Sequence, residues 1–316
     1  MRSKKLVSIV ISLYNEEENI EKLFSELHEV EKTLAEDVDL EYICVNDGSK
    51  DNTLFLLTQQ MKVHKNIKIF NFYRNFGHEI AMTAGMEHSS GDAVIFMDGD
   101  LQHPPKLIEE MIHLWKNGCS VVLTKKISKD KDKSLLYKML SASYYYILNK
   151  LSDFEIPKDF PDFRLLDRGE VEVLKQIDEH DRMFRGMLNF IGYKNYKIIE
   201  FEVPQRFAGE SKYDFKRSLG LAVDSILQFS TKPLKIATYL GLISIVIAMA
   251  LGVDTLIEYV FYNNERTGYA TTLMVILFMS SIQLIILGII GEYIGKIHIE
   301  VKKRPLYFGE LIENNN

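Results

Sequence analysis

The sequence predicts an α/β domain with a doubly wound, mainly parallel sheet, followed by a hairpin of two transmembrane helices. Two observations lead to this prediction. Over the first 125 residues, short apolar runs rich in β-branched residues alternate with segments of helical periodicity, which is the pattern of strand–helix–strand units. Towards the C-terminus, two long runs at 236–253 and 267–291 carry no charged residue.

The elements of the first region can be placed in chain order. Strands are predicted at 6–11, 42–45, 67–72, 93–97 and 120–124, and helices at 16–34, 53–62, 79–87 and 104–115. Ligands of such sheets bind at the carboxyl ends of the strands. Polar clusters at 14–18, 46–51, 74–78 and 98–102 all follow predicted strands, so we expect them to form a single site. The glycine motifs of dinucleotide dehydrogenases and P-loop ATPases are missing from the sequence, which disfavours both classes.

The two uncharged C-terminal runs have the length of membrane spans. As helices they would extend about 27–33 Å and about 37 Å, against a hydrocarbon core of about 30 Å. Basic residues flank the pair on both sides, and the loop between the helices holds two glutamates and one arginine. The positive-inside rule therefore predicts that both ends of the hairpin, and residues 1–235, are cytoplasmic.

Composition sets further limits. The formal net charge of -6 argues against non-specific nucleic-acid binding. Cys44 and Cys119 lie in apolar, strand-like stretches, so we expect two buried thiols in a reducing compartment and no disulfide framework. The sequence shows no metal motif of the Cys/His type.

Asp98-Gly99-Asp100 is the strongest candidate for a metal site. Two other Asp-x-Asp triplets lie in charged, loop-like surroundings, whereas this one ends a buried strand. Two carboxylates about 4 Å apart repel by roughly 4 kcal/mol at an effective dielectric constant of about 20, and a divalent cation offsets that repulsion. Oxygen ligands, with Gln102 as a neutral third, suit Mg²⁺ or Mn²⁺. His103 precedes two prolines that begin a helix, so we expect it at the surface.

At this point the chain resembles the family-2 glycosyltransferases of GT-A fold, and among them the polyprenyl-phosphate glycosyltransferases, which include bactoprenol glucosyltransferases and dolichyl-phosphate mannose synthases. The matching stretches are Tyr-Asn-Glu-Glu at 14–17, Asn-Asp-Gly-Ser-Lys-Asp at 46–51, Arg-Asn-Phe-Gly at 74–77, Asp-Gly-Asp-Leu-Gln-His-Pro-Pro at 98–105, Asp-Phe-Arg-Leu-Leu-Asp-Arg at 162–168, Phe-Arg-Gly at 184–186 and Arg-Phe-Ala-Gly-Glu-Ser-Lys-Tyr at 206–213. They cover nearly the whole chain in order.

The resemblance implies a role for each matching residue. It implies catalytic roles for Asp162 and Asp100, nucleotide-sugar contacts for Tyr14, Asn15, Glu16, Asp47, Asp98 and Lys126, metal ligation by Asp98, Asp100 and Gln102, and contacts to the acceptor phosphate or the diphosphate from Arg164, Arg185, Arg206, Ser211 and Lys212. Two departures stand out. Asn46 replaces the first of two aspartates common in the family, and Lys125 and Lys126 stand where arginines are usual.

These expectations define an organisation for the chain. Residues 1–212 form a cytosolic GT-A catalytic domain, 213–234 an amphipathic juxtamembrane segment or an ordinary packed helix, 235–293 two transmembrane helices with a short outer loop, and 294–316 a cytosolic tail. Glycines at 288, 291 and 295 offer a close helix contact, so a homo-oligomer is an open expectation.

The expected reaction is inverting transfer of a sugar from a nucleotide-diphosphate sugar to a polyprenyl phosphate at the cytosolic face of a bacterial inner membrane. UDP-glucose and undecaprenyl phosphate are the first expectations, and UDP-N-acetylglucosamine and GDP-mannose remain open as donors. A polysaccharide-type glycosyltransferase is an alternative, although no arginine precedes Trp115 to give its usual Arg-Trp acceptor motif. A non-catalytic membrane scaffold that binds sugar nucleotides is the second alternative.

Overall fold

The computed structural model describes residues 4–127, 150, 159–180, 182–202, 204, 230, 232–262 and 268–314. The chain divides into two compact units, one formed by Met1–Tyr145, Phe154–Tyr213 and Arg304–Asn316, the other by Tyr146–Asp153 and Asp214–Lys303. Within the described residues, the first unit holds an eight-stranded sheet and the second holds two long helices.

The sheet is mixed and mainly parallel, as predicted. Its strands are β1 (Lys5–Leu13), β2 (Val38–Asn46), β3 (Ile67–Phe72), β4 (Ala93–Asp98), β5 (Val121–Ile127), β6 (Arg164–Asp167), β7 (Tyr196–Glu202) and β8 (Gly309–Ile312). They are arranged in the order β7-β5-β6-β4-β1-β2-β3-β8. Strands β1 to β4 run parallel, whereas β6 pairs antiparallel with β4 and β5, and β8 pairs antiparallel with β3.

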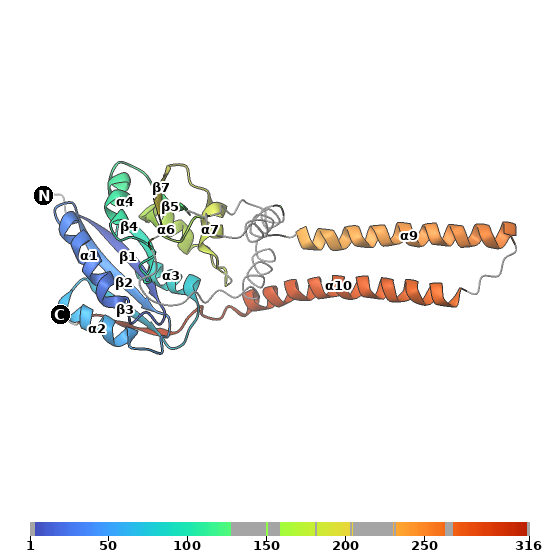
Figure 1. Cartoon of the computed structure of the whole chain (residues 1–316), viewed down its shortest axis with the longest axis horizontal. Coiled ribbons are helices and arrows are strands. Elements are labelled where there is room, and N and C mark those ends of the chain that lie inside the picture. Colours follow the sequence, from blue (N-terminus) through green and yellow to red (C-terminus); the bar gives the residue numbers. More distant parts are fainter. Residues whose placement is uncertain are drawn as a thin grey trace. The chain divides into compact units, whose positions relative to one another are not determined.

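Helices cover both faces of this sheet (Figure 1). The helices of the first unit are α1 (Ile20–Leu34), α2 (Thr53–Val63), α3 (His78–Glu87), α4 (Leu107–Lys116), α6 (Arg168–Lys175) and α7 (Phe184–Ile191). Strand β1 explains the layering, because successive side chains point to opposite faces. Ile9 and Ile11 lie in one core with α1, α2 and α4, and Val10 lies in the other with α3, α6 and α7.

The predicted elements agree with the structure over residues 5–127, with two helix starts displaced, since the helix predicted from residue 104 begins at Leu107. The helix predicted from residue 16 begins at Ile20. Asn15 has a left-handed backbone (φ 54°), and the Asn19 N–H donates to the Glu16 carbonyl at 2.9 Å in a turn. The later elements β6, β7, β8, α6 and α7 have four to eight residues each and were not predicted.

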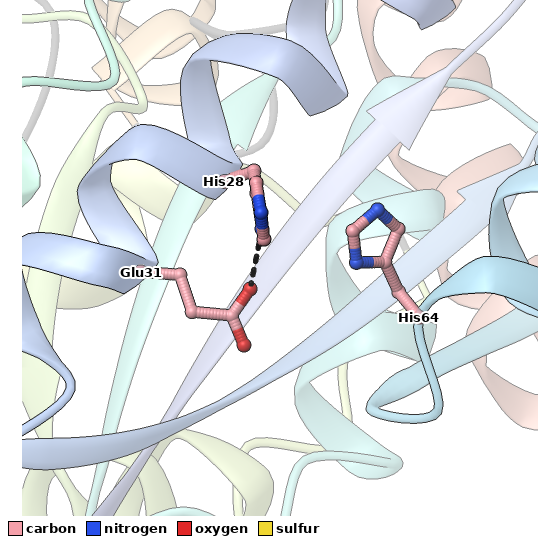
Figure 2. A group of neighbouring side chains, drawn as sticks. All are labelled: His28, Glu31 and His64. Atoms are coloured by element: carbon pink, nitrogen blue, oxygen red, sulfur yellow. Dashed lines mark ion pairs between the residues drawn. The ribbon is translucent and has the colours of Figure 1, made fainter.

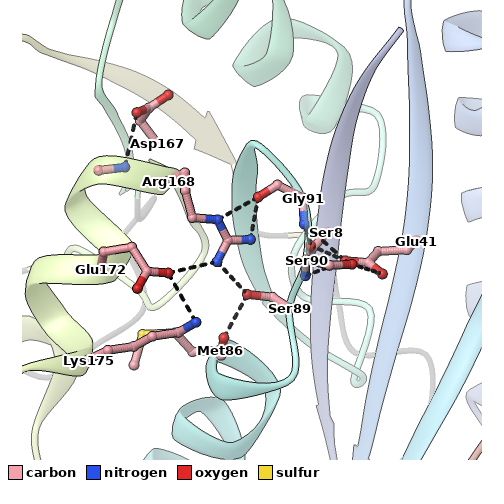
Figure 3. Close-up of polar contacts among 11 residues, drawn as sticks. Ser8, Glu41, Met86, Ser89, Ser90, Gly91, Asp167, Arg168, Glu172 and Lys175 are labelled. Carbon is pink, nitrogen blue, oxygen red and sulfur yellow. Dashed lines mark hydrogen bonds and ion pairs between the residues drawn. The ribbon is translucent and has the colours of Figure 1, made fainter. Parts of the chain in front are cut away.

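The edge of the sheet where the parallel strands begin is closed by a buried polar network (Figure 3). The Glu41 carboxylate accepts hydrogen bonds from the Ser8 hydroxyl (2.5 Å), from the N–H and hydroxyl of Ser90 (2.7 and 2.8 Å) and from the Gly91 N–H (3.1 Å). Lys68 adds an ion pair at 3.4 Å. Every oxygen of this buried acid therefore has donors.

The end of the chain returns to the sheet. Strand β8 pairs with β3 from Phe72↔Gly309 to Ile69↔Ile312, and Tyr307 stacks on Phe72 with ring centroids 5.1 Å apart. The Tyr307 hydroxyl donates to the Glu87 carboxylate. Part of the segment 294–316, expected as a tail, is thus built into the first unit.

The second unit contains α9 (Lys232–Tyr262) and α10 (Tyr269–Lys302). Within them, Lys232–Thr255 and Thr272–Lys302 are long and apolar enough to cross a membrane. Their apolar side chains are exposed, for example Met274 at 70% and Phe278 at 57%, so they do not form the core of a soluble domain. The predicted pair of long apolar helices is confirmed, and α10 continues to Lys302, past residue 293.

Candidate active site

The polar clusters predicted to share a site do lie at one edge of the sheet. Strands β1, β2, β3 and β4 are parallel and end at Leu13, Asn46, Phe72 and Asp98, so the loops that follow them meet there. Two of these loops are joined directly. The Asn15 N–H donates to the Ser49 hydroxyl at 2.9 Å, and the Lys50 N–H donates to the Asn15 side chain at 2.8 Å. Tyr14, Asn15 and Glu16 are thereby placed beside the 46–51 loop, as the motifs predicted.

Asp47 holds a third loop in place. Its buried carboxylate accepts hydrogen bonds from the Asn75 side chain (2.8 Å) and from the N–H groups of Phe76 (2.6 Å) and Gly77 (3.0 Å). Burial raises the pKa of Asp47, with these backbone donors opposing the shift. Gly48 follows with φ +62°, and a β-carbon there would lie 2.3 Å from the Arg74 carbonyl carbon, so only glycine fits this approach. In the structure, the hydrogen bonds of Asp47 fix the conformation of the 74–77 turn.

His78 lies between two acidic residues of the site, Asp98 and Asp162. It begins α3, and its Nδ1 lies 3.5 Å from Asp98 Oδ1 while its Nε2 lies 3.8 Å from Asp162 Oδ2. Nδ1 also lies 2.8 Å from the Ser12 hydroxyl. Burial alone would lower the pKa of His78, but the charges of Asp98 and Asp162 outweigh it and raise the pKa to about 10. The imidazole is therefore a cation between two carboxylates.

One carboxylate oxygen of Asp98 lacks a hydrogen-bond donor among the described residues. This atom, Oδ1, is buried and has His78 as an ion-pair neighbour. Burial raises the pKa of Asp98, but the positive charges around the carboxylate, of which His78 contributes most, together outweigh burial, and the net direction is downward. A charged, buried carboxylate oxygen without a hydrogen-bond donor fits a site that receives a cation or a ligand hydroxyl.

The turn after Asp98 is tightly constructed. Asp100 accepts a hydrogen bond from the Gln102 N–H at 3.1 Å, and Leu101 has a left-handed backbone (φ 61°) that costs about 1–2 kcal/mol in a residue other than glycine. The buried Leu101 side chain maintains that conformation. The oxygens of Asp98, Asp100 and Gln102, all on this turn, fit the ligand preference of Mg²⁺ or Mn²⁺.

The expectation that His103 lies at the surface was wrong. The side chain is 1% exposed and stacks on Phe163, with ring centroids 5.0 Å apart. Its Nδ1 accepts the Asp98 N–H at 3.0 Å, and burial lowers the pKa of His103, so the ring is neutral. The two following prolines do not expose it, because the 98–103 turn folds back over the end of β4.

Asp162 and Arg164 form a buried pair beside β6. Arg164 donates to the Asp162 carboxylate and, at 3.1 Å, to the Pro161 carbonyl. Their side chains are only 5% and 4% exposed. Asp162 lies 3.8 Å from His78, whereas Arg164 reaches this group of residues through Asp162.

The two lysines of β5 differ in their surroundings. Lys125 pairs with Glu200 on β7 at 2.6 Å. Lys126 is the next residue of the strand and so points to the opposite face, where its charge favours the ionised form of Asp98. Of the two lysines, Lys126 is therefore the one whose charge acts on Asp98.

Other predicted residues can be placed only in part. Arg185 belongs to α7, but its side chain is not described, and Arg206, Ser211, Lys212 and the juxtamembrane segment 213–229 lie outside the described residues. His78 and Ser12 were missed as site residues. The available signal was the position of His78 in the 74–78 cluster that follows β3.

The sequence comparisons agree with this arrangement. The family model for glycosyl transferase family 2 matches residues 8–174, and the GtrB C-terminal hairpin model matches residues 232–297. The chain belongs to glycosyl transferase family 2. This membership makes the protein a glycosyltransferase, and the hairpin match supports its association with a membrane.

Relatives match over almost their full length. An uncharacterized glycosyltransferase of Bacillus subtilis is 40% identical over 300 residues, covering 95% of this chain and 92% of that protein. A prophage bactoprenol glucosyl transferase homolog of Escherichia coli is 37% identical over 302 residues, covering 95% and 97%. Among solved structures, glucosyl-3-phosphoglycerate synthase from Mycobacterium tuberculosis matches with a TM-score of 0.49 at 16% identity, over 71% of this chain and 79% of that one.

Proposed function

We propose that this glycosyltransferase transfers glucose from UDP-glucose to a polyprenyl phosphate, undecaprenyl phosphate in a bacterium, with inversion at the anomeric carbon. The observation that carries the proposal is the combination, in one chain, of the acidic site of a family-2 glycosyltransferase with two exposed apolar helices. A water-soluble acceptor gives no reason for such helices, whereas a lipid acceptor does. Relatives named for glucosyl transfer to bactoprenol support this donor and acceptor.

The proposed reaction takes place at the cytosolic face of the membrane. Lysines at 232 and 235 precede the first span, and lysines at 296, 302 and 303 with Arg304 close the second. The pairing of β8 with β3 supports the same topology. Because the chain before α9 and after α10 joins one sheet, both ends of the hairpin must lie on the same side of a bilayer.

Each residue of the site has a proposed task. Tyr14, Asn15 and Glu16 line the donor beside the 46–51 loop, and Lys126 faces the diphosphate. Asp98, Asp100 and Gln102 would hold Mg²⁺ or Mn²⁺, which when bound stabilises the negative charge of the leaving diphosphate. Arg185, Arg206, Ser211 and Lys212 are proposed to contact the phosphate of the acceptor.

Asp162 is proposed to orient the acceptor and not to act as a strong base. A phosphate monoester already carries negative charge at neutral pH, so its oxygen can attack without giving up a proton to the enzyme. The Asp162 carboxylate accepts a hydrogen bond from Arg164 and faces the His78 cation, so positive charge surrounds it. Such a carboxylate is better suited to holding groups in position than to receiving a proton.

The test is lipid-linked product formation by the full chain in membranes. Radiolabelled UDP-glucose is supplied with undecaprenyl phosphate, and label is counted in an organic extract with and without EDTA. We expect label in the lipid fraction, loss of it with EDTA, and recovery on adding Mg²⁺ or Mn²⁺. Parallel reactions with UDP-N-acetylglucosamine and GDP-mannose fix the donor. If label enters the lipid from one of these donors but not from UDP-glucose, the assignment of UDP-glucose as donor is wrong. If none of the three donors gives a lipid product, the assignment of a polyprenyl phosphate as acceptor is wrong.

A further inference from the structure

A second cluster of potential metal ligands lies outside the acidic site. His28 and Glu31 are three residues apart on α1, and His64 follows the last residue of α2. Ligand atoms of the three side chains lie within 4.8 Å of one another. In Figure 2, His28 and Glu31 form an ion pair on one side, and the His64 ring faces them from the neighbouring connection.

The cluster lies at the edge of the sheet opposite the acidic site. Helix α1 leads from residue 28 towards the start of β2, and His64 shortly precedes the start of β3. The acidic residues follow the carboxyl ends of these parallel strands instead. The proposed glycosyl transfer therefore has no use for these three side chains.

Neighbouring residues hold the ligands of this cluster in place. His28 Nδ1 is buried and has no hydrogen-bond partner among the described residues, and Glu31 Oε2 lies 3.6 Å away. The other oxygen of Glu31 accepts a hydrogen bond of 2.8 Å from Asn66, which also donates to the Leu40 carbonyl at 3.0 Å. The His64 ring stacks on Phe24, with centroids 6.4 Å apart and planes 20° apart. A carboxylate oriented by an amide and an imidazole oriented by packing are typical supports of metal ligands.

We propose that His28, Glu31 and His64 bind one Zn²⁺ or a similar borderline divalent ion, with water completing the coordination. Two histidines and one glutamate form the ligand set of open zinc sites. Zinc bonds of about 2.0–2.2 Å place tetrahedral ligand atoms roughly 3.3–3.6 Å apart, a separation that His28 and Glu31 already meet. The ligand atoms of the cluster lie within 4.8 Å of one another, so a small shift of the partly exposed His64 ring, within its present packing, is enough to bring it to the ion. Mixed nitrogen and oxygen ligands select against Mg²⁺, which prefers oxygen alone.

The bound ion would join two segments that are distant in sequence. Helix α1 and the connection between α2 and β3 contribute one ligand group each to the same ion. Because the unfolded chain does not present this arrangement, the ion binds the native state and stabilises it. The proposed ion therefore cross-links two parts of the fold and takes no part in glycosyl transfer.

The test uses the full-length protein in detergent, stripped with EDTA and then titrated with Zn²⁺ in competition with a chromogenic chelator. Wild type should bind one high-affinity equivalent, and His28→Gln and His64→Gln should each weaken it by at least about 10-fold. His113→Gln is the matched control, because His113 lies on α4 beside Asn117 and does not belong to the cluster. Zn²⁺ should also raise the melting temperature of wild type and of the control more than that of either cluster variant.

The outcomes separate this site from the acidic one. Tight binding that survives the His28→Gln/His64→Gln double variant, or Zn²⁺ affinity no greater than Mg²⁺ affinity, would overturn the proposal. Loss of the tight equivalent in Asp98→Asn with the cluster intact would do the same, by assigning the ion to the acidic site. The readouts are binding and melting, so they stand whether or not lipid glucosylation is found.

Discussion

Glu41 and Asp98 are acids on the two strands that flank β1, yet their carboxylates have opposite surroundings, because Glu41 is buried and Asp98 is 34% exposed with one buried oxygen. Glu41, near the start of β2, accepts hydrogen bonds from two serine side chains and two backbone N–H groups (Figure 3). It also forms an ion pair with Lys68. Asp98, at the end of β4, keeps a buried oxygen without a hydrogen-bond donor among the described residues. At the edge where the parallel strands begin, Glu41 stabilises the fold. At the edge where they end, Asp98 has an oxygen available to a ligand.

The difference shows where stability and function are separated in this domain. A satisfied buried network contributes to folding, because removing one partner leaves donors without acceptors. An incompletely satisfied carboxylate costs stability and is retained where it binds something. Substitutions at the two edges should therefore affect different measurements.

The largest expected effect is on catalysis at the carboxyl edge. Asp100→Ala should reduce lipid glucosylation by about 10²–10³-fold, the loss typical of removing one group that stabilises developing charge. The half-exposed side chain accepts a hydrogen bond from Gln102 within its own turn, so the fold should survive. Membrane insertion and melting temperature are the controls. Unchanged transfer by Asp100→Ala would remove this residue from the metal assignment.

The second effect is on stability at the amino edge. Glu41→Ala should lower the free energy of unfolding by about 2–4 kcal/mol, because Ser8, Ser90 and Gly91 lose their common acceptor. Transfer by the folded fraction should match wild type. Denaturant titration of the purified protein measures the loss. A fall in transfer per folded molecule would show that the two edges are coupled.

The Glu41 network also predicts a pH dependence. Burial raises the pKa of Glu41, but its hydrogen bonds and Lys68 outweigh burial and lower it below the ordinary value of 4.5. A lowered pKa gives stability that is present above the unfolded-state pKa and is lost as pH falls through the native-state pKa. The stability gap between wild type and Glu41→Gln should thus narrow below about pH 4.5 and stay constant above it. Melting temperatures measured from pH 7 to pH 3 test this, and a gap that widens on acidification would contradict it.

A smaller effect is expected at His78, which provides the positive charge between the carboxylates of Asp98 and Asp162. His78→Gln removes that charge and should reduce kcat/KM by about 10–100-fold, the equivalent of losing hydrogen bonds to charged groups worth about 1.5–3 kcal/mol. His78→Lys restores a cation and should recover part of the activity. Equal losses in the two variants would indicate that ring shape, not charge, is what matters.

The smallest effect comes from a matched pair of lysines on β5. Lys126→Ala should raise the KM for the nucleotide sugar several-fold, because Lys126 faces the acidic site. Lys125→Ala, one residue earlier, should leave KM unchanged, because Lys125 pairs with Glu200 on the outer side. Initial rates at varied donor concentration distinguish the two. A larger KM change in Lys125→Ala would reverse the assignment of the strand's faces.

Sequence patterns were enough to predict the strands and helices of residues 5–127, the two long apolar helices and the acidic triplet at the end of a buried strand. These features depend on neighbours a few positions apart, which periodicity and turn residues record. The three-dimensional structure was needed to show that His78 joins Asp98 to Asp162, that Glu41 is fully paired, that His28 and His64 lie close together, and that β8 pairs with β3 after the hairpin. Each of these contacts brings together residues from separate elements, and their distances are set by strand order and helix packing, which no local pattern encodes.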